Sequence, residues 1–587
     1  MCFPDFDSPT IFAALLDHEK GGHFSITSEM PDVHCKQIYL PDTNVLITRF
    51  LSEEGVAEVT DFMPVQGLYE ENMLIRRVKS IRGTNKFKMV CAPRFDYGRV
   101  KHRVLHQVRS VLFIGGEGAG LKLQSTLQLK ISGIDAFSEF SLMPGEVADF
   151  TLGKIEGDEE VSDMIDCVNK SLFQTIGYWR SWLHNSQYQG RWRSEVNRSA
   201  LLLKLMTSKK YGSIIAAATF GLPEEIGGDK NWDYRYTWMR DAAFSLYALI
   251  RLGFTKEASE FIKWMEYTCP DIGSPGELGL MYSIRGVKEL KEQNLDHFEG
   301  YMGSRPVRIG NAAYKQLQLD IYGELIDSIY LYNKFGEPIS YDLWKYLMGQ
   351  VNWLCDNYEK KDAGIWEVRE GEQEFLYSRL MCWVALDRMI RMARQRSFPM
   401  PNKWHEVRDK IYNSIFTDFW SDELQAFVQY KGSKTLDAST LLMPLTRFIG
   451  PRDPRWLSTL DAIEKNLVSD SLVYRYACPG ESHKEMFQEG TFSLCSFWYV
   501  ESLSRAGMLE KARYYFEKML AYANHVGLYA EQLGLKGEHL GNFPQAFTHL
   551  GLISAAYNLD QNLNNARNKT HDDPHFSELF GKAKEVK

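Results

Sequence analysis

Residues 231–244 read NWDYRYTWMRDAAF, and the spacing of their side chains changes along the stretch. Up to Trp238 an aromatic ring stands at every second position, which is the period of an extended strand. Beginning with Phe244, large apolar side chains follow at helical spacing, with Tyr247 and Ile250 next. The stretch therefore predicts an extended loop that leads directly into a helix beginning near residue 241.

The same succession of a long loop and a helix repeats through the rest of the chain. Helical periodicity predicts twelve segments, at about 195–207, 241–253, 255–268, 317–334, 341–357, 377–395, 401–417, 437–448, 453–466, 491–507, 508–525 and 544–558. Long loops rich in Gly, Pro and aromatic residues precede every second helix, those that begin near 241, 317, 377, 437, 491 and 544. Six helix pairs with their long loops on one side describe an (α/α)6 barrel, with a pocket at the mouth.

The N-terminal part of the chain has a different period. Between residues 22 and 155, apolar and polar side chains alternate in short runs, with Gly, Pro, Asn and Asp between them. This pattern is typical of an antiparallel β-sandwich. The runs cover residues 23–29, 43–64, 71–83, 86–100, 103–116 and 121–133.

An acidic break, EGDEEVSD at residues 156–163, separates the two patterns. Helical spacing resumes directly after it, in the series Ile165, Val168, Leu172, Ile176 and Trp179. We predict a β-sandwich domain at 1–158, a helical linker at 159–194, the barrel domain at 195–570 and a polar C-terminal tail at 571–587.

The composition excludes some classes of partner. The 587 residues carry a net charge of -8, so neither nucleic acid nor an anionic membrane is an expected partner. No apolar run approaches the ~18 residues that cross a membrane. Asp5 and Asp7 precede the first base, Lys20, which is unlike a secretory signal. Nine cysteines without paired spacing suit reduced thiols, so a cytoplasmic location is expected.

Two glutamates stand in the long loops before the third and the sixth inner helix. Glu367 follows Ile365 and Trp366, an apolar setting that is expected to raise the pKa of its carboxyl and keep it protonated. Because the third and sixth helices of a six-membered ring lie opposite each other, Glu367 and Glu531 would face one another as an acid and a base. The alternative is that both are ordinary surface glutamates.

Other residues of the long loops suit the binding of a sugar. Aromatic faces stack on sugar rings, while Arg and Asp form paired hydrogen bonds with neighbouring hydroxyls. Arg240 and Asp241 therefore suit the closed end of a sugar pocket, with Trp238 packing beside them. Further candidates, for which salt bridging or core packing is the competing interpretation, are Arg305, Arg308, Asn311, Arg475, Glu489 and Trp498. The remaining residues of the opening stretch are left open between pocket lining and loop support: Trp232, Asp233, Tyr234, Arg235 and Tyr236.

Metal ligation and cofactor binding have little support in the sequence. The histidines at 405, 483, 525, 539 and 549 show no metal-site spacing, and neither a nucleophile elbow nor a Walker loop is present. We therefore predict no metal and no cofactor.

The chain resembles glycoside hydrolase family 15, the glucoamylase, glucodextranase and trehalase family, and in particular its intracellular trehalase-like members. The matching stretches occur in order along nearly the whole chain: FDSPTIFAALLD, PRFDYGRV, LPEEIGGDKNWDYRYTWMRDAAF, GSRPVRIGNAAYKQLQLDIYGELIDS, GIWEVR, SRLMCWVALDR, QEGTFSLCSFW and GLYAEQ with GNFPQAFTHLGLI. Their number and order make the resemblance more specific than any single motif.

The resemblance implies a fold and a reaction. The family has an N-terminal β-supersandwich and an (α/α)6 barrel, and it releases β-glucose from the non-reducing ends of α-glucosides with inversion. Glu367 would be the general acid and Glu531 the general base that activates water. Substrate-binding roles are expected for Trp238, Arg240, Asp241, Trp366, Arg369, Arg308, Arg475, Glu489 and Gln532.

The sequence also departs from the fungal glucoamylases of this family. They have a second glutamate directly after the acid, where this chain has EVR, and the chain shows no secretion signal or starch-binding module. We therefore expect a small carbohydrate, α,α-trehalose, as the substrate. The alternatives are a glucoamylase- or glucodextranase-type hydrolase, a phosphorylase and a non-catalytic sugar-binding protein. A homo-oligomer and a monomer are both compatible with the sequence.

Overall fold

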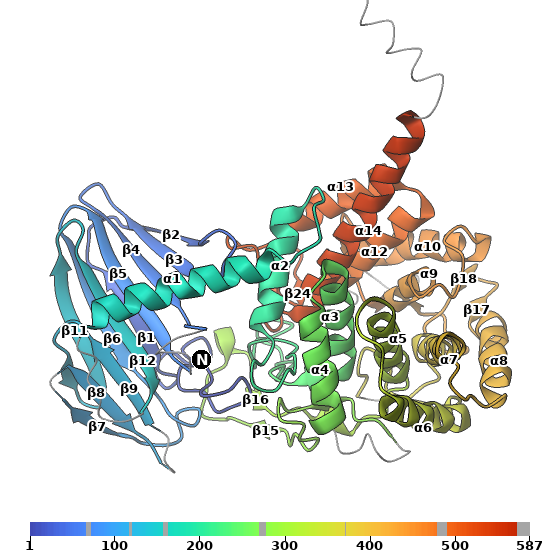
Figure 1. The fold of residues 1–587 in the computed structure, drawn as a ribbon, viewed down its shortest axis with the longest axis horizontal. Coiled ribbons are helices and arrows are strands. Elements are labelled where there is room, and N and C mark those ends of the chain that lie inside the picture. Colours follow the sequence, from blue (N-terminus) through green and yellow to red (C-terminus); the bar gives the residue numbers. More distant parts are fainter. Residues whose placement is uncertain are drawn as a thin grey trace, which may run out of the picture.

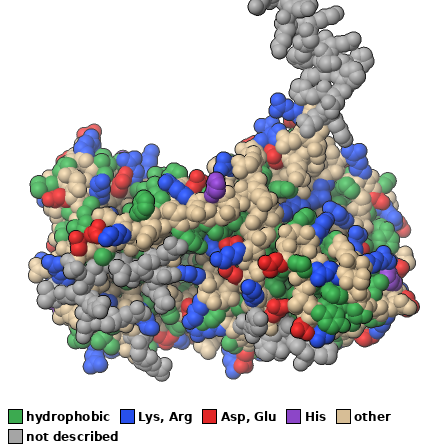
Figure 2. All heavy atoms as spheres, viewed as in Figure 1, with side chains coloured by type: hydrophobic (Ala, Val, Ile, Leu, Met, Phe, Trp, Pro, Cys, Tyr) green, Lys and Arg blue, Asp and Glu red, His purple; other side chains and the backbone are tan. Residues whose placement is uncertain are grey.

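The computed structural model describes residues 1–65, 72–107, 109–116, 120–155, 163–268, 277–369, 371–477 and 490–571. An N-terminal β-sheet region is followed by a helical domain (Figure 1). Nearly all of the predicted break at 156–163, and the predicted tail beyond residue 571, lie outside the described residues. On the face shown in Figure 2, the described acidic and basic side chains are interspersed over both regions.

Two antiparallel sheets form the β-sheet region. The larger has the order β2-β3-β4-β5-β12-β9-β8-β7 and the smaller the order β1-β6-β11-β10. The strands are β1 (His23–Ser28), β2 (His34–Tyr39), β3 (Leu46–Leu51), β4 (Val56–Phe62), β5 (Leu74–Arg82), β6 (Asn85–Ala92), β7 (Arg103–His106), β8 (Ser110–Ile114), β9 (Gly120–Ser125), β10 (Lys130–Ser132), β11 (Asp135–Leu142) and β12 (Val147–Lys154).

Buried side chains of both sheets share one core, so the two sheets pack face to face. Phe50 of the larger sheet contacts Phe87 of the smaller one with ring centres 6.0 Å apart, and Phe140 contacts Phe150 at 5.7 Å. The predicted runs did not include β2, β11 or β12. In β12 the reason is physical, because a central strand with six consecutive buried residues shows no alternation.

Helices α1 (Met164–Leu183) and α2 (Arg193–Leu205) connect the two regions (Figure 1). Val168 of α1 is buried with Phe62 and Ile75 of the larger sheet and with Val45, which directly precedes β3. The predicted helix after the acidic break is therefore present, and it covers the outer face of the larger sheet.

The helical domain contains α3 (Met239–Leu252), α4 (Thr255–Thr268), α5 (Asp320–Phe335), α6 (Tyr341–Asn357), α7 (Leu376–Arg396), α8 (Lys403–Asp418), η4 (Ala438–Leu441), α9 (Leu442–Leu445), α10 (Pro454–Leu467), α12 (Ser493–Ala506), α13 (Leu509–Leu520) and α14 (Ala546–His571). Contacts run from α3 to α5, from α5 to α7, through η4 to α12, and through α14 back to α3. These helices follow the long loops predicted from the sequence. Helices α4, α6, α8 and α13 contact the helices of this series from outside it.

Two helix predictions need correction. The segment at 437–448 is not one helix but the short pieces η4 and α9. Pro444 lacks a backbone N–H, and Arg447 adopts a left-handed conformation with φ of 66°, so the helix cannot continue. The last helix, predicted to end near residue 558, extends to His571 because no Gly or Pro interrupts it.

Short antiparallel strands, mostly in pairs and once in a sheet of three, lie in the loops of the helical domain. They are β13 (Thr237–Trp238), β14 (Met281–Tyr282), β15 (Gln293–Asn294), β16 (Arg308–Ile309), β17 (Trp420–Ser421), β18 (Ala426–Phe427), β19 (Leu436–Asp437), β20 (Val468–Ser469), β21 (Leu472–Val473), β22 (Tyr476–Ala477), β23 (Thr491–Phe492), β24 (Gln532–Leu533) and β25 (His539–Leu540). Short 3₁₀ turns lie at η2 (Tyr301–Gly303) and η3 (Ala312–Lys315). Among the described residues, no helix is long and apolar enough to span a membrane.

The N-terminal region also holds the loop that precedes α3. Arg235 is fully buried and forms an ion pair with Asp233 at 2.7 Å. Its guanidinium donates to the carbonyl of Ser8 at 2.9 Å and to the hydroxyl of Tyr97 at 3.1 Å. Because a buried guanidinium needs all these acceptors, the loop is fixed against the β-sheet region.

Candidate active site

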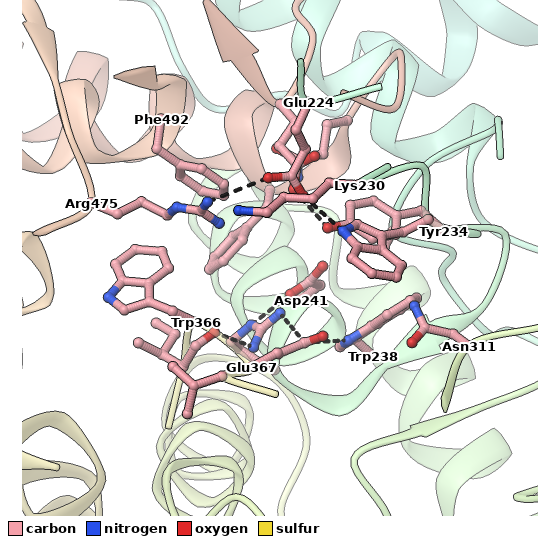
Figure 3. A pocket seen from close by; sticks show the side chains of 18 of the residues that line it. Glu224, Lys230, Tyr234, Trp238, Asp241, Asn311, Trp366, Glu367, Arg475 and Phe492 are labelled. Carbon is pink, nitrogen blue, oxygen red and sulfur yellow. Dashed lines mark hydrogen bonds and ion pairs between the residues drawn. The ribbon is translucent and has the colours of Figure 1, made fainter. Parts of the chain in front are cut away.

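The long loops enclose a pocket of about 660 Å³ (Figure 3). This size is within the usual range for small-molecule sites. Its lining includes Glu224, Asp229, Lys230, Trp232, Tyr234, Trp238, Arg240, Asp241, Asn311, Ile365, Trp366, Glu367, Val368, Arg369, Arg475, Tyr476, Phe492, Glu531, Gln545 and Phe547. Among the residues that the structure describes, no group of three or more His, Cys, Asp and Glu side chains is arranged to hold a metal ion.

Glu367 lies in the loop between α6 and α7. Its Oε1 accepts hydrogen bonds from Trp238 Nε1 at 2.8 Å and from Arg240 at 3.2 Å (Figure 3). Its backbone has φ of 56°, a left-handed conformation that is costly for a residue with a side chain. Such strain is found where the surrounding structure holds a side chain in a functional position.

The predicted apolar setting of Glu367 is wrong. Ile365, which precedes it closely in the sequence, is buried in the helical core. The indole of Trp366 donates to the carboxyl of Asp437 at 3.0 and 3.1 Å. The carboxyl of Glu367 instead accepts from an indole N–H and a guanidinium, and both groups come from the start of α3, far from Glu367 in the sequence.

Arg240 and Asp241 begin α3 and are both buried in the pocket wall. The guanidinium of Arg240 donates to Asp241 Oδ1 at 3.0 Å and to the carbonyl of Ile365 at 3.1 Å. Burial raises the pKa of Asp241, and the Arg240 charge opposes that shift. Arg240 thus joins the carboxyls of Asp241 and Glu367.

Glu531 lies before β24, and its side chain is almost completely buried. Its Oε1 accepts from Tyr234 at 2.8 Å and from Gln545 at 3.2 Å. Among the described residues, its Oε2 has no hydrogen-bond partner. Burial, and next the charge of Glu224, raise the pKa of Glu531 well above its usual value, against smaller opposing effects of Tyr234 and Arg475.

Glu224 is a pocket residue that the sequence did not single out. Its Oε1 accepts from Trp232 at 3.0 Å, and its Oε2 accepts from Gln532 at 2.8 Å and from Arg475 at 3.3 Å. It is 4% exposed. The adjacent Glu225 is exposed, and nothing in the pair of adjacent glutamates indicates which side chain points inward.

The predicted sugar-binding residues divide into two groups. Those that line the pocket are Trp238, Arg240, Asp241, Trp366, Arg369, Arg475 and Asn311. Gln532 and Arg308 do not line it. Gln532 is buried behind Glu224, and Arg308 pairs with Glu292 at 3.3 Å. Trp498 packs beside Trp366 with ring centres 6.4 Å apart, and Glu489 lies outside the described residues.

The opening stretch divides in the same way. Trp232 and Tyr234 line the pocket, whereas Asp233 and Arg235 form the buried ion pair that supports the loop. Tyr236 is buried in the helical core. From residue 232 to residue 235 the period of two thus places alternate side chains on opposite sides of the loop, and Tyr236 departs from this division.

Comparison with known families places the chain among enzymes that act on glycosidic bonds. The family model for glycosyl hydrolases family 15 matches residues 190–557. A second family model, described as trehalase-like, N-terminal, matches residues 1–133.

Similar proteins extend over almost the whole chain. A trehalase of Thermoplasma acidophilum is 35% identical over 95% of this chain and 96% of its own length. A trehalase of Mycobacterium tuberculosis is 34% identical over 94% of this chain and 85% of its own length. Among solved structures, a wild-type glycosidase is 19% identical, covers 65% of this chain and 97% of its own, and has a TM-score of 0.49.

Proposed function

The chain belongs to glycosyl hydrolases family 15, and we propose that it hydrolyses the glycosidic bond of α,α-trehalose. The relatives that match it over nearly its full length are trehalases. One observation in the structure carries the proposal. Glu367 and Glu531 come from loops 164 residues apart in the sequence (531 − 367), yet both line one pocket.

We propose an (α/α)6 barrel as the scaffold of this site. The closed series of contacts from α3 through α5, α7, η4, α12 and α14 supports a ring of six inner segments. Residues 195–570 would form the barrel, 1–158 the β-sandwich and 159–194 the linker. The pocket would then lie at the mouth, where the long loops meet.

Glu367 is the proposed general acid. Its Oε1 is engaged by Trp238 and Arg240, so the proton that reaches the glycosidic oxygen would be on Oε2. As the bond to the leaving sugar breaks, the electron pair stays with that oxygen and the proton of Glu367 neutralises it.

Glu531 is the proposed general base. Its Oε1 is engaged by Tyr234 and Gln545, and its Oε2 is buried without a hydrogen-bond partner among the described residues, so the attacking water would have to enter beside this carboxyl to give up its proton. In an inverting reaction the two carboxyls lie roughly 6.5 to 9.5 Å apart, with the water on the face opposite the leaving group. The product would be β-glucose, and proton NMR of early turnover that shows α-glucose would exclude inversion.

Arg240 and Asp241 are proposed to bind the hydroxyls of the terminal glucose. Both are buried at the start of α3, and both line the pocket. Arg475, which pairs with Glu224, would contribute a further cation to the pocket (Figure 3). Fixed, buried polar groups of this kind discriminate between sugars because any group left without a partner is costly.

Glucose release provides the decisive test. The protein would be assayed on trehalose, maltose, isomaltose and soluble starch, with and without phosphate, beside the variant Glu367→Gln. We expect phosphate-independent glucose release from trehalose that the variant loses. Release that depends on phosphate would indicate a phosphorylase. Absence of release from every substrate would indicate a binding protein.

A further inference from the structure

The solvent end of the pocket contains an arrangement that the proposed mechanism does not use. The side chain of Arg369 is 41% exposed, whereas Glu531 is 3% exposed, so Arg369 marks the end near solvent. Its guanidinium carbon lies 3.9 Å from the ring centre of Trp232. Both side chains line the pocket. An aromatic ring that would otherwise stack on a sugar therefore carries a cation.

Trp232 is fixed in this position from the inner side. Its indole nitrogen donates to Glu224 Oε1 at 3.0 Å, and its backbone carbonyl accepts from Gly221 and Asn542, both at 2.9 Å. The ring therefore cannot turn away from the cation that covers it without losing a buried hydrogen bond.

Glu292 holds the guanidinium of Arg369 over Trp232. One of its carboxylate oxygens lies 3.3 Å from the guanidinium of Arg369 and accepts from the backbone of Ala312 at 3.1 Å. The other lies 3.3 Å from Arg308, whose guanidinium carbon is 4.8 Å from the ring centre of Trp232. One carboxylate thus holds two guanidiniums over one ring.

Arg369 and the proposed acid, Glu367, belong to the same loop. Arg369 follows Glu367 by two residues, and the side chain of Gln316 donates to the carbonyls of Glu367 at 3.4 Å and Val368 at 3.2 Å. The backbone that carries Arg369 is therefore held in place relative to the carboxyl that would protonate the scissile bond.

We propose that Arg369 determines substrate length: its guanidinium, held over Trp232 by Glu292, limits the pocket to short α-glucosides, with disaccharides the preferred class. This inference rests on the proposed hydrolase function. A disaccharide places its second sugar between the acid and the guanidinium, whose N–H groups donate to hydroxyls of that sugar. A third sugar would have to displace the guanidinium before it could stack on Trp232.

The experiment compares Arg369→Ala and Glu292→Gln with the wild-type protein on trehalose, maltose, maltotriose and maltoheptaose. Arg99→Ala is a matched control, because Arg99 is also 41% exposed, pairs with Asp96 at 2.7 Å and lies 5.3 Å from the ring centre of Tyr97, outside the pocket lining. We expect kcat/KM for maltotriose and maltoheptaose, relative to the best disaccharide, to rise about tenfold in both test variants, the size of effect expected from one lost cation–π contact and its ion pair. The change should appear mainly in KM, and the control should keep the wild-type ratio.

Three results would overturn the inference while leaving the proposed function intact. They are a wild-type protein that cleaves maltoheptaose as efficiently as a disaccharide, an unchanged ratio in both variants, and an equal loss of activity on every substrate. A wild-type protein that releases glucose from none of the substrates would instead refute the proposed function, and the inference with it.

Discussion

The two carboxyls proposed to do the chemistry have opposite electrostatic surroundings. Glu367, with a side chain that is 20% exposed, lies against the cation Arg240 at 3.2 Å. Glu531 is 3% exposed, and its direct donors are the neutral Tyr234 and Gln545. Burial, and next the charge of Glu224, raise its pKa. The surroundings of Glu367 therefore favour a negative charge, whereas the surroundings of Glu531 oppose one.

This difference favours the two proton transfers of the proposed reaction, from Glu367 to the leaving group and from water to Glu531. In the proposed reaction Glu367 would give up a proton, and Arg240 would stabilise the carboxylate that remains. Glu531 would accept a proton, and its repulsion with Glu224 would then disappear. Both surroundings therefore favour the charges present after proton transfer over those present before it. Interactions that strengthen in this way would lower the free energy of the transition state relative to the ground state.

The largest expected effect is loss of activity when either carboxyl is replaced. Glu367→Gln and Glu531→Gln should each reduce kcat on trehalose by about 10²- to 10⁴-fold, the usual contribution of a general acid or base. Glucose release under saturating substrate measures this. Glu374→Gln is the control, since Glu374 lies in the same loop as Glu367 but pairs with Arg379 at 2.9 Å outside the pocket lining. Near-normal kcat in either test variant would contradict that residue's proposed role.

The same two variants should change stability in opposite directions. Above pH 7, Glu531→Gln removes a carboxyl whose ionisation burial opposes, so the free energy of unfolding should increase. Glu367→Gln replaces a carboxyl that accepts from buried Arg240 with an amide, which is a weaker acceptor for a guanidinium, so the free energy of unfolding should decrease. Each change should be about 1–3 kcal/mol. Chemical denaturation provides the measurement. Changes of the same sign in the free energy of unfolding would show that the surroundings of Glu367 and Glu531 do not differ as described.

A smaller effect should appear in the pH profile of Glu224→Gln. Because the charge of Glu224 raises the pKa of Glu531, its removal should lower that pKa. The base works only when ionised, so activity is lost as pH falls through its pKa, and the acid limb of kcat/KM should move to lower pH. A limb that stays in place, or moves to higher pH, would exclude the coupling between these carboxyls.

The smallest expected effect concerns a buried carboxyl outside the pocket lining. Burial, and next the charge of Asp320, raise the pKa of Asp362 to about 7, while its Oδ2 accepts from Leu319 and Ser378. A raised pKa means that stability is lost as pH rises from the unfolded value through the folded value. Asp362→Asn should therefore lose less stability between pH 4 and pH 8, as measured by denaturation at both pH values. If the variant loses as much stability between pH 4 and pH 8 as the wild-type protein, Asp362 does not cause that loss.

Much of the fold could be predicted from periodicity, because the spacing of apolar side chains is a local property. The alternation in β1, β4, β6 and β9 indicated strands, and helical spacing located α3 to α8 within a few residues. The failures have equally local causes. In β12 burial on both faces removes the alternation, and at η4 and α9 a proline and a left-handed residue interrupt a helical pattern.

The sequence by itself determined which residue types the long loops bring to a pocket. It singled out Glu367, Glu531, Arg240 and Asp241, because loops before alternate helices must meet at one end. Only the tertiary structure decided the partners of these groups. Glu224 and Gln532 are 308 residues apart, and Glu367 and Arg240 are 127 apart. The setting of a carboxyl depends on charges and donors a few ångströms away in space, and neighbours in the sequence do not supply them.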